Sequence, residues 1–304
     1  MIVKAVKEDL AELRELWKIC FPDEDPGFLE FFGKNRWDPS YCYVSKEDGK
    51  IVSTLTRIPH AIMFNGKVLS VSMITAVATL PDYRNRGYMH DLLRTVTDAC
   101  EHSELLTFIK TEEPALYEPF GFRSAFPRNA YMIRRRDLKR VSPFGIAYEV
   151  KALDMLKVYS AYIRRFNGFY TRDLRDFVTY RKEIISTGGK IIGYFNSHDR
   201  IDGYAAVRMQ GTNLYVDELV YLDSVSLVKL LNACLAERPY VHFHTSGAEN
   251  LDPMFPNAEK KKYDSVMVRI NNFELFNKLF GADATNVSQA LSISKKPLNM
   301  NESY

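Results

Sequence analysis

Residues that could bind an anion lie between an apolar strand and a helix, in the segment VATLPDYRNRGYM at positions 77–89. The strand stops at Pro81, and a turn that contains Arg84, Arg86 and Gly87 opens directly into the helix. The first backbone N–H groups of a helix have no partner inside it, and the positive end of the helix dipole lies behind them. Gly87 permits close approach of a phosphate that a Cβ atom would block, and either arginine can add a charge-assisted contact. The segment therefore predicts a phosphate-binding turn.

The same segment resembles the acetyl-coenzyme A signature of the GNAT superfamily of N-acetyltransferases, R-x-x-G-x-G/A after a V-x-V/T-x-P strand. In that family the turn holds the pyrophosphate of the cofactor, and the backbone of the preceding strand bonds the pantetheine arm and the acetyl carbonyl. The resemblance implies that Val77, Ala78 and Thr79 line the thioester. Met89 departs from the small residue that is usual at its position. The implied pyrophosphate contacts are Arg84, Asn85, Arg86, Gly87, Tyr88 and Met89.

A second motif, LYEPFGF at positions 116–122, resembles the family's Y-x-x-x-G-F element and implies that Tyr117 is the general acid. Attack of an amine on a thioester expels a thiolate, which a nearby phenol can protonate. The reference pKa values of a thiol and a phenol, about 8.5 and about 10, are close enough for this transfer. The alternative role for Tyr117 is packing beside Phe120 and Phe122.

The sequence does not point to a general base. An alkyl amine with a pKa of about 10.4 is neutral in only about one molecule in a few thousand at pH 7, so its deprotonation must be assisted. The strand at 70–79 carries no Glu, Asp or His. His60, Glu112, Glu113, the terminal carboxylate of Tyr304 and a chain of water molecules all stay open as the base.

The surrounding pattern predicts the elements that position these residues. We expect helices at 8–19, 27–32 and 88–102, strands at 2–6, 41–45, 51–57, 61–64, 68–79, 105–110 and 124–134, and a hairpin turn at Asn65-Gly66. The second half repeats the order of hairpin strands, helix and strand with strands at 190–195, 204–209, 214–221 and 240–245. It has no equivalent of the Arg84–Gly87 turn. The fold class is therefore α/β, an α+β mixed sheet.

Two GNAT-like halves make the chain similar to the enhanced-intracellular-survival (Eis) type of acetyltransferase, which implies a tandem GNAT fold with a degenerate second copy. We expect an N-terminal GNAT domain with the acetyl-CoA site at 1–140 and a second GNAT-like domain at 141–270. Residues 271–304 are expected to form a short helix and a loose polar tail from about Gly281, too short for the complete sterol-carrier-like domain of the Eis type. In the Eis type the C-terminal carboxylate of the chain serves as the general base. Whether the carboxylate of Tyr304 reaches the active site of this protein stays open.

The composition limits the partners. The chain has 304 residues, 46% of them hydrophobic, and its 41 basic and 38 acidic side chains leave a net charge of +3. Such a balance does not indicate a nucleic-acid-binding protein, and the basic run at 133–140 is interpreted as a strand end and linker. No signal peptide or membrane-spanning stretch is recognisable, so we expect a cytoplasmic protein with no membrane partner.

A metal site is not expected. The four cysteines lie far apart and form no C-x-x-C pair, and His242 and His244 share a strand face without a nearby carboxylate or cysteine. We interpret both histidines as strand residues.

These patterns together predict an N-acetyltransferase that moves acetyl from acetyl-CoA to a primary amine of a small molecule or peptide in a ternary complex. The acceptor's identity stays open, and the family resemblance allows a homo-oligomer. A non-catalytic CoA-binding sensor or assembly protein is the alternative, because the base is missing. A transferase that uses a charged tRNA is a more remote alternative, because that class has often lost the pyrophosphate turn, which is intact in this sequence.

Overall fold

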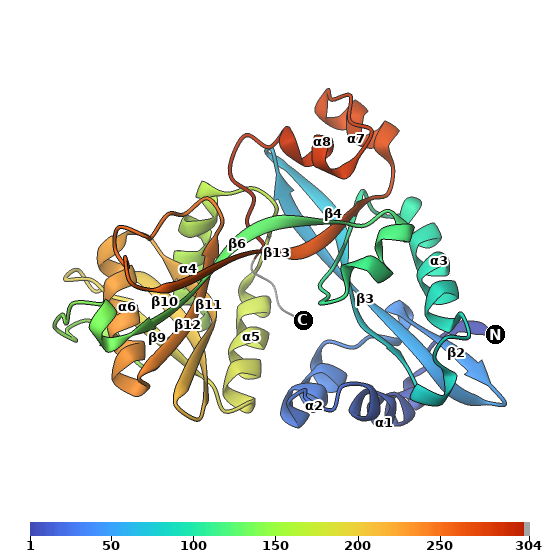
Figure 1. The fold of residues 1–304 in the computed structure, drawn as a ribbon, viewed down its shortest axis with the longest axis horizontal. Helices are drawn as coiled ribbons and strands as arrows, with labels where there is room; N and C mark the ends of the chain where they lie inside the picture. The colour runs from blue at the N-terminus through green and yellow to red at the C-terminus, as the bar shows by residue number, and fades with distance from the viewer. Residues whose placement is uncertain (301–304) are drawn as a thin grey trace. The chain divides into compact units, whose positions relative to one another are not determined.

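A computed structural model describes residues 1–300 of the chain (Figure 1). The described residues form two compact units. The first unit contains Met1–Ala125 and Val266–Ser294, and the second contains Phe126–Ser265 and residues 295–300. The units therefore divide within two long strands, β6 (Arg123–Arg134) and β13 (Glu259–Ile270), and differ from the expected divisions after residues 140 and 270.

The first unit is built on a mixed sheet with the strand order β1-β2-β3-β4-β5-β13. β4 and β5 are parallel, and the other neighbours are antiparallel. Asn65 and Gly66, with φ of 45° and 82°, make the tight turn between β3 and β4. The elements of this unit are β1 (Ile2–Lys4), α1 (Leu10–Cys20), α2 (Pro26–Asn35), β2 (Cys42–Glu47), β3 (Lys50–Phe64), β4 (Lys67–Thr79), α3 (Tyr88–Glu101), β5 (Leu106–Ile109), α7 (Phe273–Phe280) and α8 (Val287–Ser292).

Helical periodicity explains how the sheet is covered. α3 buries Leu92, Leu93, Val96 and Cys100 in one cluster with residues of β3, β4 and β5. α1 buries Leu13, Leu16 and Trp17 in a second cluster with residues of α2, β2 and β3. These two clusters hold α1, α2 and α3 against the strands that carry the predicted site.

The second unit repeats this topology. β9, β10 and β11 form an antiparallel meander, α6 follows, and β12 then pairs in parallel with β11. The first unit has the same order in β2, β3, β4, α3 and β5, so the mixed α/β class and the duplication are confirmed. The elements of this unit are β7 (Ile146–Ala147), α4 (Ala152–Tyr162), β8 (Phe169–Tyr170), α5 (Leu174–Ser186), β9 (Lys190–Phe195), β10 (Ile201–Gln210), β11 (Asn213–Tyr221), α6 (Ser224–Glu237) and β12 (Tyr240–Ser246).

The polar C-terminal segment differs from the expected loose tail. Val287, Ala290 and Leu291 of α8 are buried, because a helix with small and apolar residues on one face can pack despite its polar neighbours. Asn167 donates from its backbone N–H to the carbonyl of Pro297 and accepts from the N–H of Asn299, both at 2.9 Å. Tyr304 lies outside the described residues.

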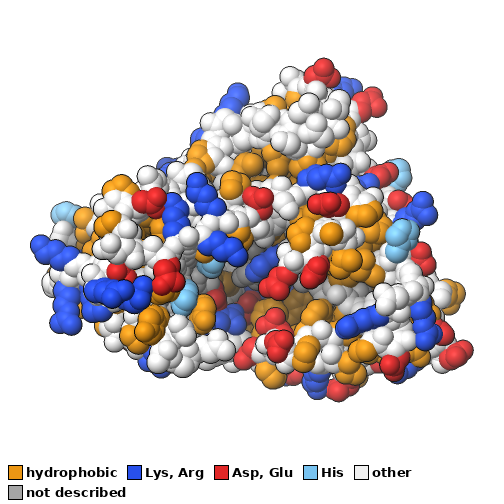
Figure 2. Space-filling model, in the orientation of Figure 1, with side chains coloured by type: hydrophobic (Ala, Val, Ile, Leu, Met, Phe, Trp, Pro, Cys, Tyr) orange, Lys and Arg blue, Asp and Glu red, His pale blue; other side chains and the backbone are white. Residues whose placement is uncertain are grey.

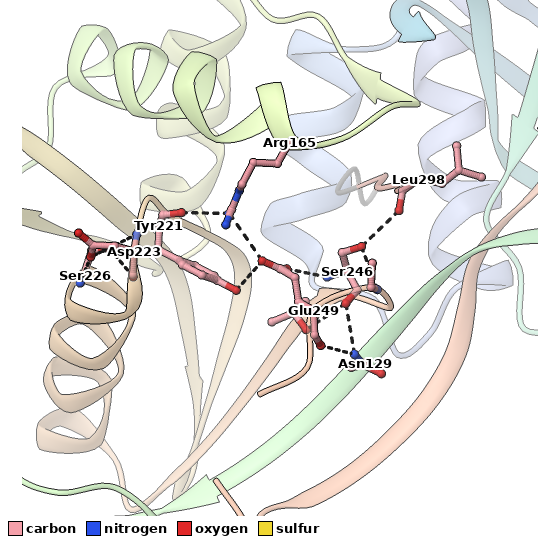
Figure 3. A network of polar contacts seen from close by, with 10 residues as sticks. Asn129, Arg165, Tyr221, Asp223, Ser226, Ser246, Glu249 and Leu298 are labelled. Atoms are coloured by element: carbon pink, nitrogen blue, oxygen red, sulfur yellow. Dashed lines mark hydrogen bonds and ion pairs between the residues drawn. The ribbon is translucent and has the colours of Figure 1, made fainter. Parts of the chain in front are cut away.

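A polar network in the second unit holds the segment that contains Leu298 (Figure 3). The Ser246 hydroxyl donates to the carbonyl of Leu298 at 3.3 Å, and the Asn129 amide donates to the carbonyls of Ser246 and Glu249 at 3.2 and 2.9 Å. Tyr221 donates its hydroxyl to the Glu249 carboxylate at 2.8 Å. The segment is therefore fixed by paired backbone and side-chain groups rather than by apolar contact alone.

Candidate active site

The site begins where two parallel strands separate. β4 pairs with β5 only from Val71 to Ile74, although β4 continues to Thr79. Beyond Ile74, β4 bulges against β3 at Ala76, which has a φ of 49°. A bulge bends a strand and redirects its backbone, so β4 turns away from β5 at this point. The last residues of β4 consequently line pockets where a strand partner would otherwise lie.

One pocket, of about 410 Å³, contains the predicted cofactor residues and is named the cofactor pocket. It runs from the end of β4, across the turn after Pro81, to the first residues of α3. Of the predicted cofactor contacts, only Arg86 does not line this pocket. The guanidinium carbon of Arg86 lies 5.1 Å from the ring centre of Tyr83. The predicted residues that line the pocket are Val77, Ala78, Thr79, Arg84, Asn85, Gly87, Tyr88 and Met89, together with Tyr117.

The N-terminus of α3 is open to a ligand. Gly87 is the N-cap with a φ of 88°, and no side chain caps the helix. The first bond into the helix runs from the Asp91 N–H to the Gly87 carbonyl, so the N–H groups of Tyr88, Met89 and His90 precede it. A Cβ atom added at Gly87 would meet no atom within 4 Å and would project into this open space. The turn thus fits a diphosphate.

The corresponding helix of the second unit is closed. α6 follows β11 after only Leu222 and Asp223, and the Asp223 carboxylate accepts from the Ser226 N–H at 2.8 Å. A carboxylate at that position satisfies a helix N–H and repels a phosphate. This is the physical reason why the second copy lacks an anion site at its helix.

Arg84 closes one side of the cofactor pocket. Its Nε donates to the carbonyl of Thr79 at 3.1 Å, which holds the exposed guanidinium beside the end of β4. The same carbonyl accepts from the Cys20 thiol at 3.4 Å. Tyr88 also lines the pocket, and its hydroxyl contacts the Glu47 carboxylate. A positive charge at Arg84 is therefore available to a bound anion without a carboxylate partner among residues 1–300.

A second pocket, of about 250 Å³, adjoins the first and is named the acceptor pocket. α1, α2 and the turn between them supply one wall, and β4 and the residues after β5 supply the other. Phe21, Val77 and Tyr117 line both pockets. A group held in one pocket therefore meets a group held in the other beside Val77 and Tyr117.

Tyr117 lies between two short 3₁₀ turns, Pro114–Leu116 and Glu118–Phe120, and is 7% exposed. Its ring makes an edge contact with Phe122 at a centroid distance of 6.4 Å. Burial raises the pKa of the Tyr117 phenol, and the hydrogen bond with Thr111 only partly opposes this. Tyr117 is accordingly a neutral phenol at physiological pH and has a proton to donate.

The carboxylate that lines the acceptor pocket is Glu24, which belongs to none of the sequence motifs. His60, Glu112 and Glu113 do not lie among the described residues that line either pocket, and Tyr304 lies outside the described part. Glu24 follows Phe21 in a turn closed by a bond from its N–H to the Phe21 carbonyl at 3.2 Å. The sequence feature that could have identified Glu24 is its position in the break between two helices, where a proline lies on either side of it.

Comparison with known sequences places the first part of the chain in a family. Residues 2–125 match the sequence model of the acetyltransferase (GNAT) domain. Residues 2–125 therefore carry the sequence pattern of a GNAT acetyltransferase domain. The match spans the cofactor pocket and the acceptor pocket, and it confirms the expectation of a GNAT-type acetyltransferase. No curated protein matches the chain by sequence.

Solved structures extend the likeness in fold beyond the GNAT domain. A probable N-acyltransferase from Enterococcus faecalis superposes with a TM-score of 0.76 at 20% identity, over 89% of this chain and 72% of that chain. A GCN5-related N-acetyltransferase from Anabaena variabilis gives 0.75 at 18% identity, over 90% and 73%. Eis1 from Mycobacterium abscessus gives 0.68 at 14% identity, over 91% and 75%. The expected likeness to the Eis type is confirmed for the fold.

The remaining features concern surface charge, metal-binding groups and membrane-spanning helices. On the face shown in Figure 2, acidic side chains lie among the basic ones. Within residues 1–300 no group of three or more His, Cys, Asp or Glu side chains could hold a metal ion. No helix in this part of the chain is long and apolar enough to cross a membrane.

Proposed function

We propose that the GNAT domain transfers an acetyl group from acetyl-CoA to a primary amine of a small molecule or peptide in a ternary complex. The observation that carries the proposal is the meeting of the cofactor pocket and the acceptor pocket at Val77 and Tyr117. The open N-terminus of α3 fits the pyrophosphate, and the separated end of β4 fits the pantetheine arm. GNAT acetyltransferases use acetyl-CoA as the donor.

Each residue has a defined part in this reaction. The amine nitrogen attacks the acetyl carbonyl carbon, and main-chain N–H groups at the end of β4 stabilise the oxygen that becomes negative. The carbon–sulfur bond then breaks, and Tyr117 gives its proton to the leaving sulfur. An ammonium nitrogen loses two protons in the whole reaction: one is delivered to the sulfur by way of Tyr117, and the other goes to solvent. Aligning the two substrates in adjoining pockets removes much of the entropic barrier.

The reaction should accelerate with rising pH. Below the pKa of the acceptor amine, the neutral fraction grows about tenfold per pH unit, and kcat/KM should follow it from pH 6 to pH 9. Tyr117 acts in its protonated form, and burial raises its pKa above the usual value of about 10, so it stays protonated throughout this range. Release of free thiol from acetyl-CoA measures the profile. A decrease in kcat/KM as the pH rises toward 9 would contradict Tyr117 as the acid.

Acetyl-CoA should protect Cys20 from alkylation. Cys20 lines the cofactor pocket and is partly exposed, whereas Cys42, Cys100 and Cys234 are buried. Burial raises the pKa of the Cys20 thiol, so labelling by iodoacetamide is best followed at about pH 8.5. We expect saturating acetyl-CoA to slow labelling at least about tenfold, as measured by mass spectrometry of the Cys20 peptide, with Cys20→Ser as the control. An unchanged rate would place the ligand elsewhere.

The function itself is tested by incubating the whole chain with acetyl-CoA and a library of primary amines. Thiol release that depends on an amine, together with a mass gain of one acetyl group on that amine, supports the proposal. Binding of acetyl-CoA without turnover on any amine would instead support the alternative of a non-catalytic CoA-binding sensor. The cytoplasmic location, the homo-oligomer and the lack of nucleic-acid and membrane partners stay predictions.

A further inference from the structure

One wall of the acceptor pocket is aromatic. Trp17 of α1, Phe21 of the following turn, and Phe28 and Phe32 of α2 line it together. The ring of Phe32 contacts Trp17 edge-on at a centroid distance of 5.3 Å and lies 6.4 Å from Phe28. These contacts, and the buried position of Trp17 at 1% exposure, fix the rings before any ligand arrives. A preformed aromatic wall favours an apolar or aromatic body over a hydrated one.

The pocket carries little charge. Among the residues of the first unit that line it, Glu24 is the carboxylate and Lys110 the cation. Glu24 is exposed at the mouth, in the same turn as Phe21, which also lines the cofactor pocket. One carboxylate can pair with one ammonium group. A second ammonium group inside the pocket would lie against apolar rings or near Lys110, and either position costs free energy.

The pocket is also small, and few side-chain hydroxyl groups line it. Its volume of about 250 Å³ is below the usual range for drug-sized ligands, about 300 to 1,000 Å³. The lining hydroxyl groups are those of Thr75, Thr111 and Tyr117. A sugar amine could not pair all of its hydroxyl groups with these three side chains, and a buried hydroxyl group without a partner is unfavourable.

From these observations we infer that the acceptor is a small primary monoamine on an apolar or aromatic body, with its ammonium group held by Glu24. The inference rests on the proposed function. The aromatic wall binds the body, Glu24 draws the ammonium group into the mouth, and the nitrogen reaches the acetyl group beside Val77 and Tyr117. The amine is deprotonated in the open mouth, and its proton passes to solvent.

The test compares three amines at saturating acetyl-CoA: 2-phenylethylamine, spermidine and glucosamine. We expect kcat/KM for 2-phenylethylamine to exceed the other two by at least about tenfold. Glu24→Gln should raise the KM for 2-phenylethylamine about tenfold and leave kcat within about twofold, because the ammonium loses its counter-charge but the reacting groups stay in place. Glu15→Gln is the matched control on the exposed face of α1, where Glu15 pairs with Lys18, and should change neither constant.

A second variant tests the aromatic wall. Phe28→Ala should lower kcat/KM for 2-phenylethylamine at least about tenfold and change that for methylamine less than about threefold, because methylamine has no body to bind. Preference for spermidine or glucosamine, or an unchanged KM in Glu24→Gln, would overturn the inference and leave the acetyltransferase proposal standing. Failure of the chain to bind acetyl-CoA would overturn both. Binding of acetyl-CoA without acetylation of any of the three amines would overturn the inference.

Discussion

Tyr117→Phe is expected to lower kcat by about 10²- to 10⁴-fold and to leave the Kd for acetyl-CoA within about twofold of the wild-type value. The substitution removes the hydroxyl proton and keeps the ring, which packs against Phe122 in a site where Tyr117 is 7% exposed. The thiolate then leaves without a proton donor, whereas the pyrophosphate turn at Gly87 is untouched. Single-turnover thiol release and calorimetric titration measure the two quantities separately.

Tyr43→Phe is the matched control for Tyr117→Phe. Tyr43 lies on β2 in the same unit, partly buried beside the same apolar cluster, and lines neither pocket. Its loss of a hydroxyl should leave kcat unchanged. If Tyr117→Phe kept more than about half of the wild-type kcat, Tyr117 would be a packing residue, the alternative that its position beside Phe120 and Phe122 left open.

The second large effect is expected in the stability of the second unit. Arg172 and Glu218 form an ion pair at 2.9 Å, with side chains only 7% and 1% exposed. Tyr204 adds a hydrogen bond to the Glu218 carboxylate at 2.5 Å, and Tyr159 lies 4.9 Å from the Arg172 guanidinium. Glu218→Gln removes the counter-charge of a buried cation and should lower the free energy of unfolding by about 3–5 kcal/mol. Urea unfolding followed by circular dichroism measures the loss.

Two further variants test whether the stability loss in Glu218→Gln comes from the unpaired buried charge or would follow any substitution in the second unit. Glu237→Gln removes a solvent-exposed pair with Lys190 at 3.1 Å and should cost no more than about 1 kcal/mol. The double substitution Arg172→Met with Glu218→Leu should recover most of the stability lost in Glu218→Gln, because it removes both charges. A loss below about 1 kcal/mol in Glu218→Gln would show that other groups around Arg172 compensate for its charge.

The cofactor side of the candidate site can be predicted from the sequence because its residues are contiguous in the chain. A strand, a turn with Gly87 and a helix are contiguous in the chain. These residues form the anion site by themselves, without contributions from distant parts of the chain. The loss of the anion site in the second copy is equally local, since the Asp223 side chain caps α6 whereas Gly87 leaves the N-terminus of α3 open. Tyr117 is recognisable because a short motif surrounds it.

The acceptor side could not be predicted in the same way. Glu24 and Phe28 reach Val77 and Thr111 only through the packing of α1 and α2 on the sheet, and no periodicity encodes that contact. β13 was also missed: its first residues include Lys260, Lys261 and Lys262, which mask the alternation that begins near Val266. Residues 267–270 nevertheless pair with β5, so a strand distant in the chain completes the first sheet.

The proposed cofactor site is tested most directly by calorimetric titration of acetyl-CoA into the wild type, Gly87→Glu and Gly66→Glu. Both glycines have positive φ, 88° and 82°, and a Cβ atom at either would meet open space. The two variants therefore carry the same backbone strain and the same charge, but only Gly87 lies in the cofactor pocket. We predict one-site binding by the wild type and Gly66→Glu, and binding at least about 100-fold weaker in Gly87→Glu, where a carboxylate faces the pyrophosphate. Equal binding by all three, or none by the wild type, would contradict the proposed cofactor site.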